Sequence, residues 1–290
     1  MTKFETRFTE DGSKTFYSQE FQETFHSKYG AKKESEITYI KGCKIPEKLA
    51  QKDSLKIIDI CYGLGYNSAS VLTYHRAINP QCKLEIIALE LDHNVPLSAI
   101  AQNLLNNWDQ EIINILTTLA TEKTVIQDNI KLKLIIADAR KTLATLKAKK
   151  IQADAIFLDP FSPPKCPQLW TVEFLQLVSQ CLQPHGIIAT YSCSAAVRSA
   201  MKLSKLTIGA NYGIGRRTPG TVASYHNQNF VPLSPMELEH LQTRAAIPYR
   251  DPNLEDSAKT IIERREKEQL LSDKEFTSQW KKRWFKDKNN

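Results

Sequence analysis

A glycine pair and a carboxylate stand where two apolar runs of this sequence end. Gly63 and Gly65 follow the run at 55–60, and Glu90 follows the run at 84–89. Glycine lets a ligand approach the backbone closely, and the start of a following helix offers unpaired N–H groups. A carboxylate at the end of the second strand can accept hydrogen bonds from both hydroxyls of a ribose. These residue types therefore predict a nucleoside-binding site.

A further acid, Asp138, follows the apolar run at 131–137 and could accept a hydrogen bond from an adenine amino group. Asp92 competes with Glu90 for the ribose. Each residue also has a structural interpretation, since Glu90 could be a solvated strand end and Asp138 the N-cap of a helix at Arg140. Three such features at successive strand ends favour the binding site over three separate structural roles.

The stretch with the most specific pattern is Phe-Leu-Asp-Pro-Phe-Ser-Pro-Pro-Lys-Cys-Pro-Gln-Leu-Trp, from Phe157 to Trp170. Its four prolines predict a rigid loop directly after the apolar run at 153–158. Asp159 would lie at the base of this loop, at the reacting centre. Phe161 and Trp170 could stack on a base, although core packing is the favoured alternative for Trp170.

The elements that must position these residues alternate between strand and helix patterns. This alternation predicts a doubly wound, Rossmann-like α/β sheet whose ligand lies at the carboxyl ends of the strands. The expected strands are 55–60, 84–89, 131–137, 153–158 and 186–191, with weaker ones at 207–212 and 221–225. The expected helices are 67–78, 95–120 (long or broken), 140–149, 170–183 and 195–204.

The composition of the chain changes on either side of this alternating region. Residues 1–54 are polar with interspersed aromatics and predict an N-terminal extension with short strands or a helix. Residues 55–235 form the expected Rossmann-like domain, and residues 236–290 a charged, mostly helical tail. A chain of 290 residues that is 41% hydrophobic can bury a sizeable core.

The net charge of +7 makes nucleic acid a reasonable partner. The six cysteines form no CxxC pair and no cluster with zinc spacing, so no metal is expected. No stretch approaches the roughly 20 apolar residues of a membrane helix. A soluble, cytoplasmic protein without membrane contact is therefore expected, and its oligomeric state stays open.

The order of acid, glycine turn, ribose acid and adenine acid is similar to that of S-adenosylmethionine-dependent methyltransferases. The resemblance implies S-adenosylmethionine as cofactor, held by eight residues from four places in the chain: Asp59, Tyr62, Gly63, Gly65, Asn67, Glu90, Asp138 and Asp159. The first glycine of the family is Cys61 here. The dinucleotide pattern G-x-G-x-x-G is not met because Ser68 stands at its third glycine, which disfavours a nicotinamide enzyme.

The proline loop resembles the methyltransferase domain of MnmC-type tRNA-modifying proteins, with Pro160 in place of a glycine and Cys166 in place of an asparagine. The likeness extends over residues 11–224 and is closest to the stand-alone form without an oxidase domain. It includes Gly63-Leu64-Gly65-Tyr66-Asn67, Tyr191-Ser192, Val197-Arg198, Gly215-Arg216-Arg217 and Gly220-Thr221-Val222-Ala223-Ser224.

This resemblance implies methylation of the aminomethyl group on the wobble uridine in the anticodon loop of tRNA. Asp159 would orient the amine, because an aspartate with an ordinary pKa is a poor base. Tyr191 or Ser192 would line the same pocket. The expected phosphate contacts are Lys165, Arg198, Arg216 and Arg217.

Two other interpretations remain open. One is a small-molecule amine methyltransferase, or an aminopropyltransferase-like enzyme similar to spermidine synthase, which also has an aspartate after the fourth strand. The other is a nucleic-acid-binding protein with a vestigial cofactor fold, to which Cys61 in the glycine turn points. Cofactor binding separates the second from the enzymes, and dependence on tRNA separates the enzymes from each other.

Overall fold

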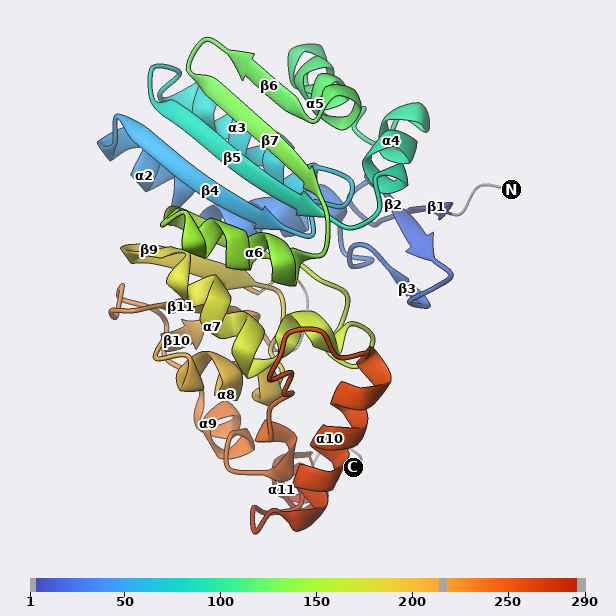
Figure 1. Ribbon diagram of the computed structural model, residues 1–290, viewed down its shortest axis with the longest axis vertical. Helices are drawn as coiled ribbons and strands as arrows, with labels where there is room; N and C mark the ends of the chain where they lie inside the picture. Colours follow the sequence, from blue (N-terminus) through green and yellow to red (C-terminus); the bar gives the residue numbers. More distant parts are fainter. Residues whose placement is uncertain (1–3, 214–217, 286–290) are drawn as a thin grey trace.

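An eight-stranded mixed sheet forms the centre of the protein, in the order β10-β11-β9-β8-β4-β5-β7-β6 (Figure 1). The computed structural model describes residues 4–213 and 218–285. The five central strands are parallel, and all five were predicted. They are β4 (Ser54–Ile60), β5 (Lys83–Glu90), β7 (Ile130–Ile136), β8 (Ala153–Leu158) and β9 (Leu182–Thr190).

Antiparallel strands close both edges of this sheet. On one side β11 (Thr221–Ser224) pairs with β9, and β10 (Thr207–Ala210) pairs with β11. On the other side β6 (Thr124–Gln127) pairs with β7. The sequence pattern missed β6, because three of its four residues are exposed and it carries no apolar run.

The strand order reverses at β4, which makes this strand the switch point of the sheet. From β4 the chain builds β5 and β7 on one side and then β8 and β9 on the other. In an open α/β sheet such a reversal leaves a crevice beyond the carboxyl ends of the strands, where ligands bind. The glycine turn after β4, Glu90, Asp138 and Asp159 therefore gather at one edge of the sheet.

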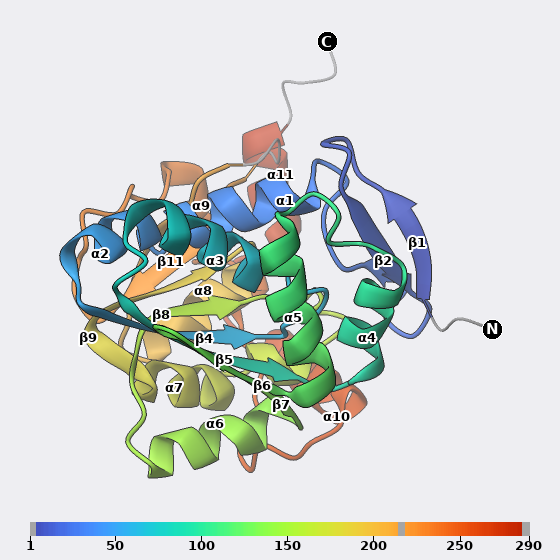
Figure 2. The same cartoon turned by 90° about the horizontal axis from the view of Figure 1, so that it is seen from above.

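Helices cover both faces of the sheet, so each parallel strand is apolar on both sides. Ile57 and Ile58, adjacent in β4, belong to opposite cores. In Figure 2, α3 and α5 lie on one face and α6 and α7 on the other. The core on the side of α3 and α5 also includes residues of α2, and the core on the side of α6 and α7 includes residues of α8. The bounds are α2 (Ile45–Gln51), α3 (Tyr66–Ile78), α5 (Gln110–Glu122), α6 (Ala139–Ala148), α7 (Val172–Gln180) and α8 (Ala195–Leu203).

Two of the expected helices differ in detail. The pattern at 95–120 is a broken helix, with α4 (Asn94–Ala101) and α5 separated by turns. The pattern at 170–183 ends earlier, because Leu182 already belongs to β9. A short 3-10 helix, η2 (Pro167–Trp170), precedes α7.

The N-terminal segment forms a small antiparallel sheet beyond the carboxyl ends of β4 and β5 (Figure 1). Its strands are β1 (Phe4–Phe8), β2 (Lys14–Ser18) and β3 (Glu23–Thr24). A short helix, α1 (Ala31–Glu34), then continues as a π-helix, η1 (Ser35–Lys41). Phe16 and Tyr39 are completely buried in the core shared with the large sheet. The N-terminal segment is therefore part of the packed body.

The C-terminal tail is helical, as expected, and returns to the sheet. Its helices are α9 (Pro235–His240), the 3-10 turn η3 (Arg244–Ala246), α10 (Ala258–Leu271) and α11 (Thr277–Phe285). Between η3 and α10, Tyr249 forms a parallel β-bridge with Thr171, and the N–H of Asp251 donates to Glu173. The domain limits at residues 54 and 235 stay a prediction. Within 4–213 and 218–285, no helix is long and apolar enough to cross a membrane.

Candidate active site

The turn after β4 has the left-handed backbone that glycine favours. The φ angles are +67° at Cys61, +56° at Gly63 and +89° at Gly65. A Cβ atom on Gly65 would lie 2.5 Å from the hydroxyl oxygen of Tyr62, so this position has no room for a side chain. Cys61 adopts the conformation that explains the family's glycine at this position, at the strain cost of a non-glycine residue.

Glu90, the last residue of β5, holds this turn to the neighbouring strand. Its Oε2 accepts the N–H of Gly63 at 2.9 Å, while Oε1 accepts the N–H groups of Leu91 and Asp92. Burial raises the pKa of Glu90, and the three N–H groups oppose that rise. Glu90 is therefore a positioned carboxylate and not a solvated strand end.

Asp138 is both an N-cap and a cavity residue. Its Oδ1 accepts the N–H of Arg140, which confirms the N-cap interpretation. The Arg140 guanidinium also pairs with the carboxylate, with Nη2 and Oδ2 2.7 Å apart. These bonds lower the pKa of Asp138 against the effect of burial. Asp138 is thus held as an anion beside the ends of β5 and β7.

These carboxylates line a cavity of about 840 Å³ at the carboxyl ends of the strands, here called the larger cavity. Gly63, Glu90 and Asp138 contribute polar groups to its wall. Leu91 contributes an apolar side chain that is 70% exposed. A mostly apolar cavity with a few placed polar groups is typical of a cofactor site.

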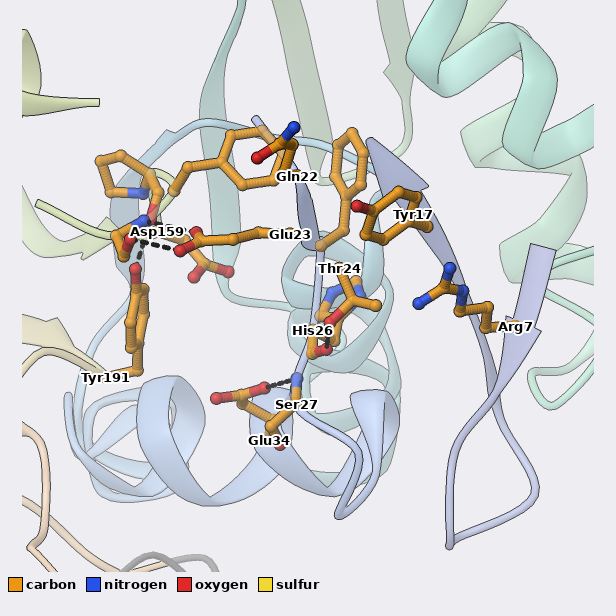
Figure 3. A pocket seen from close by; sticks show the side chains of 14 residues that line it. Arg7, Tyr17, Gln22, Glu23, Thr24, His26, Ser27, Glu34, Asp159 and Tyr191 are labelled. Carbon is orange, nitrogen blue, oxygen red and sulfur yellow. Dashed lines mark hydrogen bonds between the residues drawn. The ribbon is translucent and has the colours of Figure 1, made fainter. Parts of the chain in front are cut away.

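A second cavity of about 420 Å³, here called the smaller cavity, lies between the N-terminal sheet and the loop after β8 (Figure 3). Asp159 and Tyr191 line one side, and Arg7 and Tyr17 lie across from them. The other described lining residues are Gln22, Glu23, Thr24, Phe25, His26, Ser27, Glu34, Pro160, Phe161 and Ser162.

The two cavities share one wall. Asp159, Phe25 and Phe161 line both of them. The Phe161 ring stacks on Phe21 at 4.2 Å between centroids and meets Phe25 edge-on at 5.0 Å. Two ligands bound side by side would therefore meet at Asp159, with an aromatic cluster beside them.

Asp159 lies between groups that change its acidity. Burial raises its pKa well above the ordinary value, and the nearby carboxylate of Glu34 raises it further. Tyr39 and Asn67 oppose the rise, with Asn67 Nδ2 3.2 Å from Asp159 Oδ2. The expectation of an ordinary aspartate pKa is therefore wrong, because the pKa of this carboxylate is raised.

Other residues expected to touch the cofactor support the site from behind. Asp59 is completely buried and accepts a hydrogen bond from Ser68 in α3. The expected direct contact between Asp59 and the cofactor is therefore not supported. Burial raises the Asp59 pKa to about 7. Tyr62 and Asn67 are also buried, Tyr62 against Gly65 and Asn67 against Asp159.

Trp170 belongs to the core and is not available to stack on a base. It is 0% exposed, and its Nε1–H donates to the carbonyl of Phe161 at 2.8 Å. The expected substrate contact is therefore wrong, and the core-packing alternative is right. Trp170 instead fixes the backbone of the proline loop. Tyr191 does the same, because its hydroxyl donates to the carbonyl of Pro160 at 2.8 Å.

Arg198 is also not a phosphate contact. It is 2% exposed and pairs with Glu237, the N3 residue of the capping box of α9, at 2.8 Å. Its remaining N–H groups donate to Thr221 and to the carbonyls of Pro219 and Gly220. In the sequence, Arg198 is a cation shortly before a basic loop. No pattern near Arg198 indicates that its partner is Glu237, 39 residues later in the chain.

Lys165 is exposed at the edge of the larger cavity, as a phosphate contact requires. Arg216 and Arg217 lie outside the described residues, so their expected role is not tested.

The sequence pattern missed the residues of the smaller cavity that precede residue 35. Glu23 accepts the N–H of Ser162 at 3.0 Å and also its hydroxyl, and so holds the proline loop. His26 is half-buried, and the loss of solvent around its ring lowers its pKa to about 4, which keeps it neutral. None of these residues follows an apolar strand of the large sheet, so the strand pattern does not indicate them. Within the ranges 4–213 and 218–285, no group of His, Cys, Asp and Glu is arranged to hold a metal.

Comparisons with known proteins find methyltransferases that are similar to this chain. A family model described as S-adenosyl-L-methionine-dependent methyltransferase matches residues 96–226. The crystal structure of MnmC2 from Aquifex aeolicus is 30% identical, has a TM-score of 0.81, and is matched over 92% of this chain and 85% of that one. The uncharacterized protein MJ0670 of Methanocaldococcus jannaschii is 30% identical over 266 residues, 89% of this chain and 70% of that protein.

A further relative is longer than this chain. The tRNA 5-methylaminomethyl-2-thiouridine biosynthesis bifunctional protein MnmC of Acidovorax sp. (strain JS42) is 26% identical over 201 residues. The match covers 66% of this chain but only 30% of the bifunctional protein.

The fold and the strand-end site define a Rossmann-like methyltransferase that uses S-adenosylmethionine. Within this class, the chain belongs to the MnmC-type methyltransferase family, as its likeness to the Aquifex MnmC2 structure shows. The expected membership of this family is thereby confirmed.

The residues around the larger cavity fit S-adenosylmethionine. Gln168 lines this cavity, and its Oε1 is a buried acceptor without a hydrogen-bond partner among the residues that the structure describes. Such an atom calls for a donor from a ligand, which the adenine amino group supplies. Glu90 and Asp138 offer carboxylates for the ribose and the adenine, and Leu91 offers an apolar surface for the rings.

Proposed function

We propose that this chain transfers a methyl group from S-adenosylmethionine to the aminomethyl group on the wobble uridine of tRNA, giving methylaminomethyl-uridine. The observation that carries this proposal is the wall of Asp159, Phe25 and Phe161 shared by the two cavities. A methyl donor in the larger cavity and an amine in the smaller cavity would meet there. The name of the bifunctional MnmC relative, which includes 5-methylaminomethyl-2-thiouridine of tRNA, supports this acceptor.

In this proposal the strand-end residues hold the cofactor. Glu90 accepts the ribose hydroxyls, Asp138 accepts the adenine amino group, and Gly63 allows close approach of the backbone. Asp59, Tyr62, Gly65 and Asn67 hold the turn in shape from behind. When bound, S-adenosylmethionine supplies a methyl group activated by a positively charged sulfur.

Asp159 positions the amine and receives its proton. The nitrogen lone pair forms the new C–N bond while the C–S bond breaks and its electron pair goes to sulfur. The nitrogen then carries one proton too many, which the Asp159 carboxylate accepts. Its raised pKa suits this role better than an ordinary aspartate would. Holding the two reactants in contact supplies the main part of the rate enhancement.

The tRNA must present a base turned out of its stack. Turning it out costs a few kcal/mol at most. Phe161 has one face covered by Phe21, so the base would meet it from another side. Lys165 would contact a nearby phosphate, with Arg216 and Arg217 as further candidates. A cytoplasmic location and contact with the anticodon loop belong to this same proposal.

A small-molecule amine methyltransferase is the second candidate, and one observation favours it. The smaller cavity carries the carboxylates of Glu23, Glu34 and Asp159, a lining that would also suit a free amine. The same experiment separates the two candidates.

Purified protein is incubated with methyl-labelled S-adenosylmethionine and tRNA from cells blocked at the aminomethyl stage, and the labelled nucleoside is identified. Label in methylaminomethyl-uridine is the expected result. tRNA whose wobble uridine carries no aminomethyl group is the negative control. Absence of label from tRNA, together with label in a polyamine or another small amine, would refute the tRNA proposal in favour of the second candidate.

A further inference from the structure

We propose that Arg7, stacked on the ring of Tyr17, forms a phosphate-binding site in the wall of the smaller cavity, and that it binds the phosphodiester of the nucleotide whose amine is methylated. This inference rests on the proposed function and adds a second group that recognises the acceptor. Arg7 belongs to β1, outside the stretch that the family model matches.

The N-terminal sheet presents one of its faces to the smaller cavity. Strands β1 and β2 pair antiparallel, with Arg7 opposite Thr15 and Glu5 opposite Tyr17. Because side chains alternate along a strand, these four residues lie on one face of the sheet, and Phe16 on the other face packs in the core. The register therefore brings Arg7 and Tyr17 together to the cavity wall.

The stacking on Tyr17 positions the guanidinium of Arg7. Its Cζ atom lies 3.9 Å from the centroid of the Tyr17 ring. This contact favours one orientation of a side chain that has several rotatable bonds. Figure 3 shows Arg7 and Tyr17 across the cavity from Asp159. The smaller cavity therefore has a positioned cation opposite the carboxylate that is proposed to receive the proton of the amine.

The hydrogen bonds of Arg7 leave it able to bind an anion. Nε and Nη2 donate to the carboxylate of Glu5 at 3.2 and 3.4 Å, which is long for charged partners. The side chains of Arg7 and Glu5 are 44% and 59% exposed, and an exposed ion pair contributes little. Nη1 donates to none of the residues that the structure describes. A phosphate can therefore bind at Nη1 and compete with Glu5 for the other N–H groups.

The charges of the proposed acceptor match this arrangement. A nucleotide with an aminomethyl base carries a cation at the amine and an anion at the phosphodiester. Arginine suits phosphate because its planar fork can bind two oxygens at once. Among the described lining residues Arg7 is the one permanent cation, since loss of solvent lowers the pKa of His26 to about 4. With the amine at Asp159, Arg7 is the partner that this wall offers to the phosphate of the same nucleotide.

The test measures binding to protein loaded with S-adenosylhomocysteine, by titration calorimetry. The probes are 5-aminomethyluridine, its 5′-phosphate and its 3′-phosphate. We expect wild type to bind one of the two nucleotides about tenfold to a hundredfold more tightly than the nucleoside. Arg7→Gln should bind all three alike. Arg7→Lys should keep part of the difference, because it retains the charge without the fork.

Arg76→Gln is the matched control. Arg76 in α3 is also exposed and pairs with an exposed carboxylate, that of Glu111, but it lines neither cavity. This variant should bind the three probes like wild type. Circular dichroism and the affinity for S-adenosylhomocysteine show whether each variant is folded and binds the cofactor product.

Glu5→Gln should have the opposite effect to Arg7→Gln. Without the competing carboxylate, Arg7 is free for the phosphate, so the affinity for the preferred nucleotide should rise about twofold to fivefold. The affinity for the nucleoside should not change. Glu10→Gln removes the same charge from an exposed position after β1 that is not paired with Arg7, and it serves as control.

The same variants are then compared with tRNA. Arg7→Gln should raise KM about tenfold, leave kcat within about threefold, and lower the slope of log affinity against log salt by about one. Equal binding of the nucleoside and both nucleotides by wild type would overturn the inference. A nucleotide preference that Arg7→Gln retains would also overturn it. Inorganic phosphate that binds as tightly as the preferred nucleotide would identify a site for free anions instead.

Failure of the proposed function is recognised separately. If wild type labels no tRNA, a preference for nucleotide over nucleoside that depends on Arg7 still supports the phosphate site. If wild type labels tRNA and Arg7→Gln does so with the same KM and salt slope, the proposed function stands and the inference is wrong.

Discussion

Nη1 of Arg140 lies 2.9 Å from Oδ2 of Asp251, a carboxylate that is completely buried in the C-terminal tail. The same guanidinium holds Asp138 at the wall of the larger cavity. Asp251 is itself fixed, because its Oδ1 accepts the N–H groups of Glu255 and Asp256. Through Arg140, the tail therefore positions Asp138, the carboxylate that is proposed to bind the cofactor.

Asp251→Asn is expected to raise the dissociation constant for S-adenosylhomocysteine about tenfold. Asparagine keeps the acceptor for Glu255 and Asp256 but turns a donor toward Arg140, which releases the guanidinium and with it Asp138. A 10- to 100-fold effect is usual for residues that position a ligand through another side chain. Titration calorimetry measures the affinity, and Asp273→Asn on the exposed end of the tail serves as control. An unchanged affinity with a lower melting temperature would limit Asp251 to a folding role.

The large sheet and the larger cavity, where the methyl donor is proposed to bind, could be predicted from patterns of neighbouring residues. Each parallel strand is buried on both faces and reads as an apolar run, and its carboxyl end lies at the ligand edge. Glu90 and Asp159 could therefore be placed from their neighbours in the chain alone. The edge strand β6 carries no such run and was missed.

The acceptor half depended on contacts between distant segments. Glu34 and Asp159 line the same cavity although they are more than a hundred residues apart, and nothing near residue 34 indicates this. The π-helical turn at Ser35–Lys41 has no pattern that separates it from an ordinary helix. Arg198 was misassigned for the same reason, since its partner Glu237 is 39 residues away.

On acidification, activity should be lost at a higher pH than it would be if Asp159 had an ordinary pKa. The Asp159 pKa is raised by burial and by Glu34, so the proton that blocks its acceptor role binds well above pH 4. kcat/KM should rise with pH through this raised pKa and then level. Measurement of the pH profile from 5 to 9 checks this, with Asp159→Asn as the comparison. A folded Asp159→Asn variant with full turnover and unchanged tRNA affinity would exclude the role of Asp159.

Cys61→Gly should stabilise the protein by about 1 kcal/mol, because the left-handed backbone at this position strains a residue with a Cβ atom. The φ angle of +67° is the observation behind this expectation. Urea unfolding measures the change, and affinity for S-adenosylhomocysteine should stay within about twofold of wild type. Cys181→Gly, in the buried core at the end of α7, should instead destabilise. A loss of stability in Cys61→Gly would show that the thiol packs better than the strain costs.

Lys165→Ala should weaken tRNA binding and lower the slope of log affinity against log salt by about one, as expected for one lost phosphate contact. Lys165 is exposed beside the larger cavity. Lys147→Ala, exposed on α6, removes the same charge away from both cavities and is the matched control. Equal salt slopes in the two variants would rule out the contact.

Arg198→Gln should lower the free energy of unfolding by about 3–5 kcal/mol, because it leaves the Glu237 carboxylate buried without its cation. The tRNA affinity of the folded protein should not change, since Arg198 is 2% exposed. Urea unfolding and a filter-binding assay on folded protein measure the two quantities. The reverse pattern, weak binding at normal stability, would restore the phosphate contact expected from the sequence.

The origin of the smaller cavity has a consequence for how acceptor preference is inherited in this family. Of its fourteen described lining residues, nine precede residue 35, whereas the family model begins at residue 96. The same N-terminal stretch also lines the larger cavity, with Phe4, Ser18, Gln19, Glu20, Phe21 and Phe25. Under the proposed function, exchange of this stretch between relatives would therefore be expected to change the acceptor cavity and one wall of the donor cavity together.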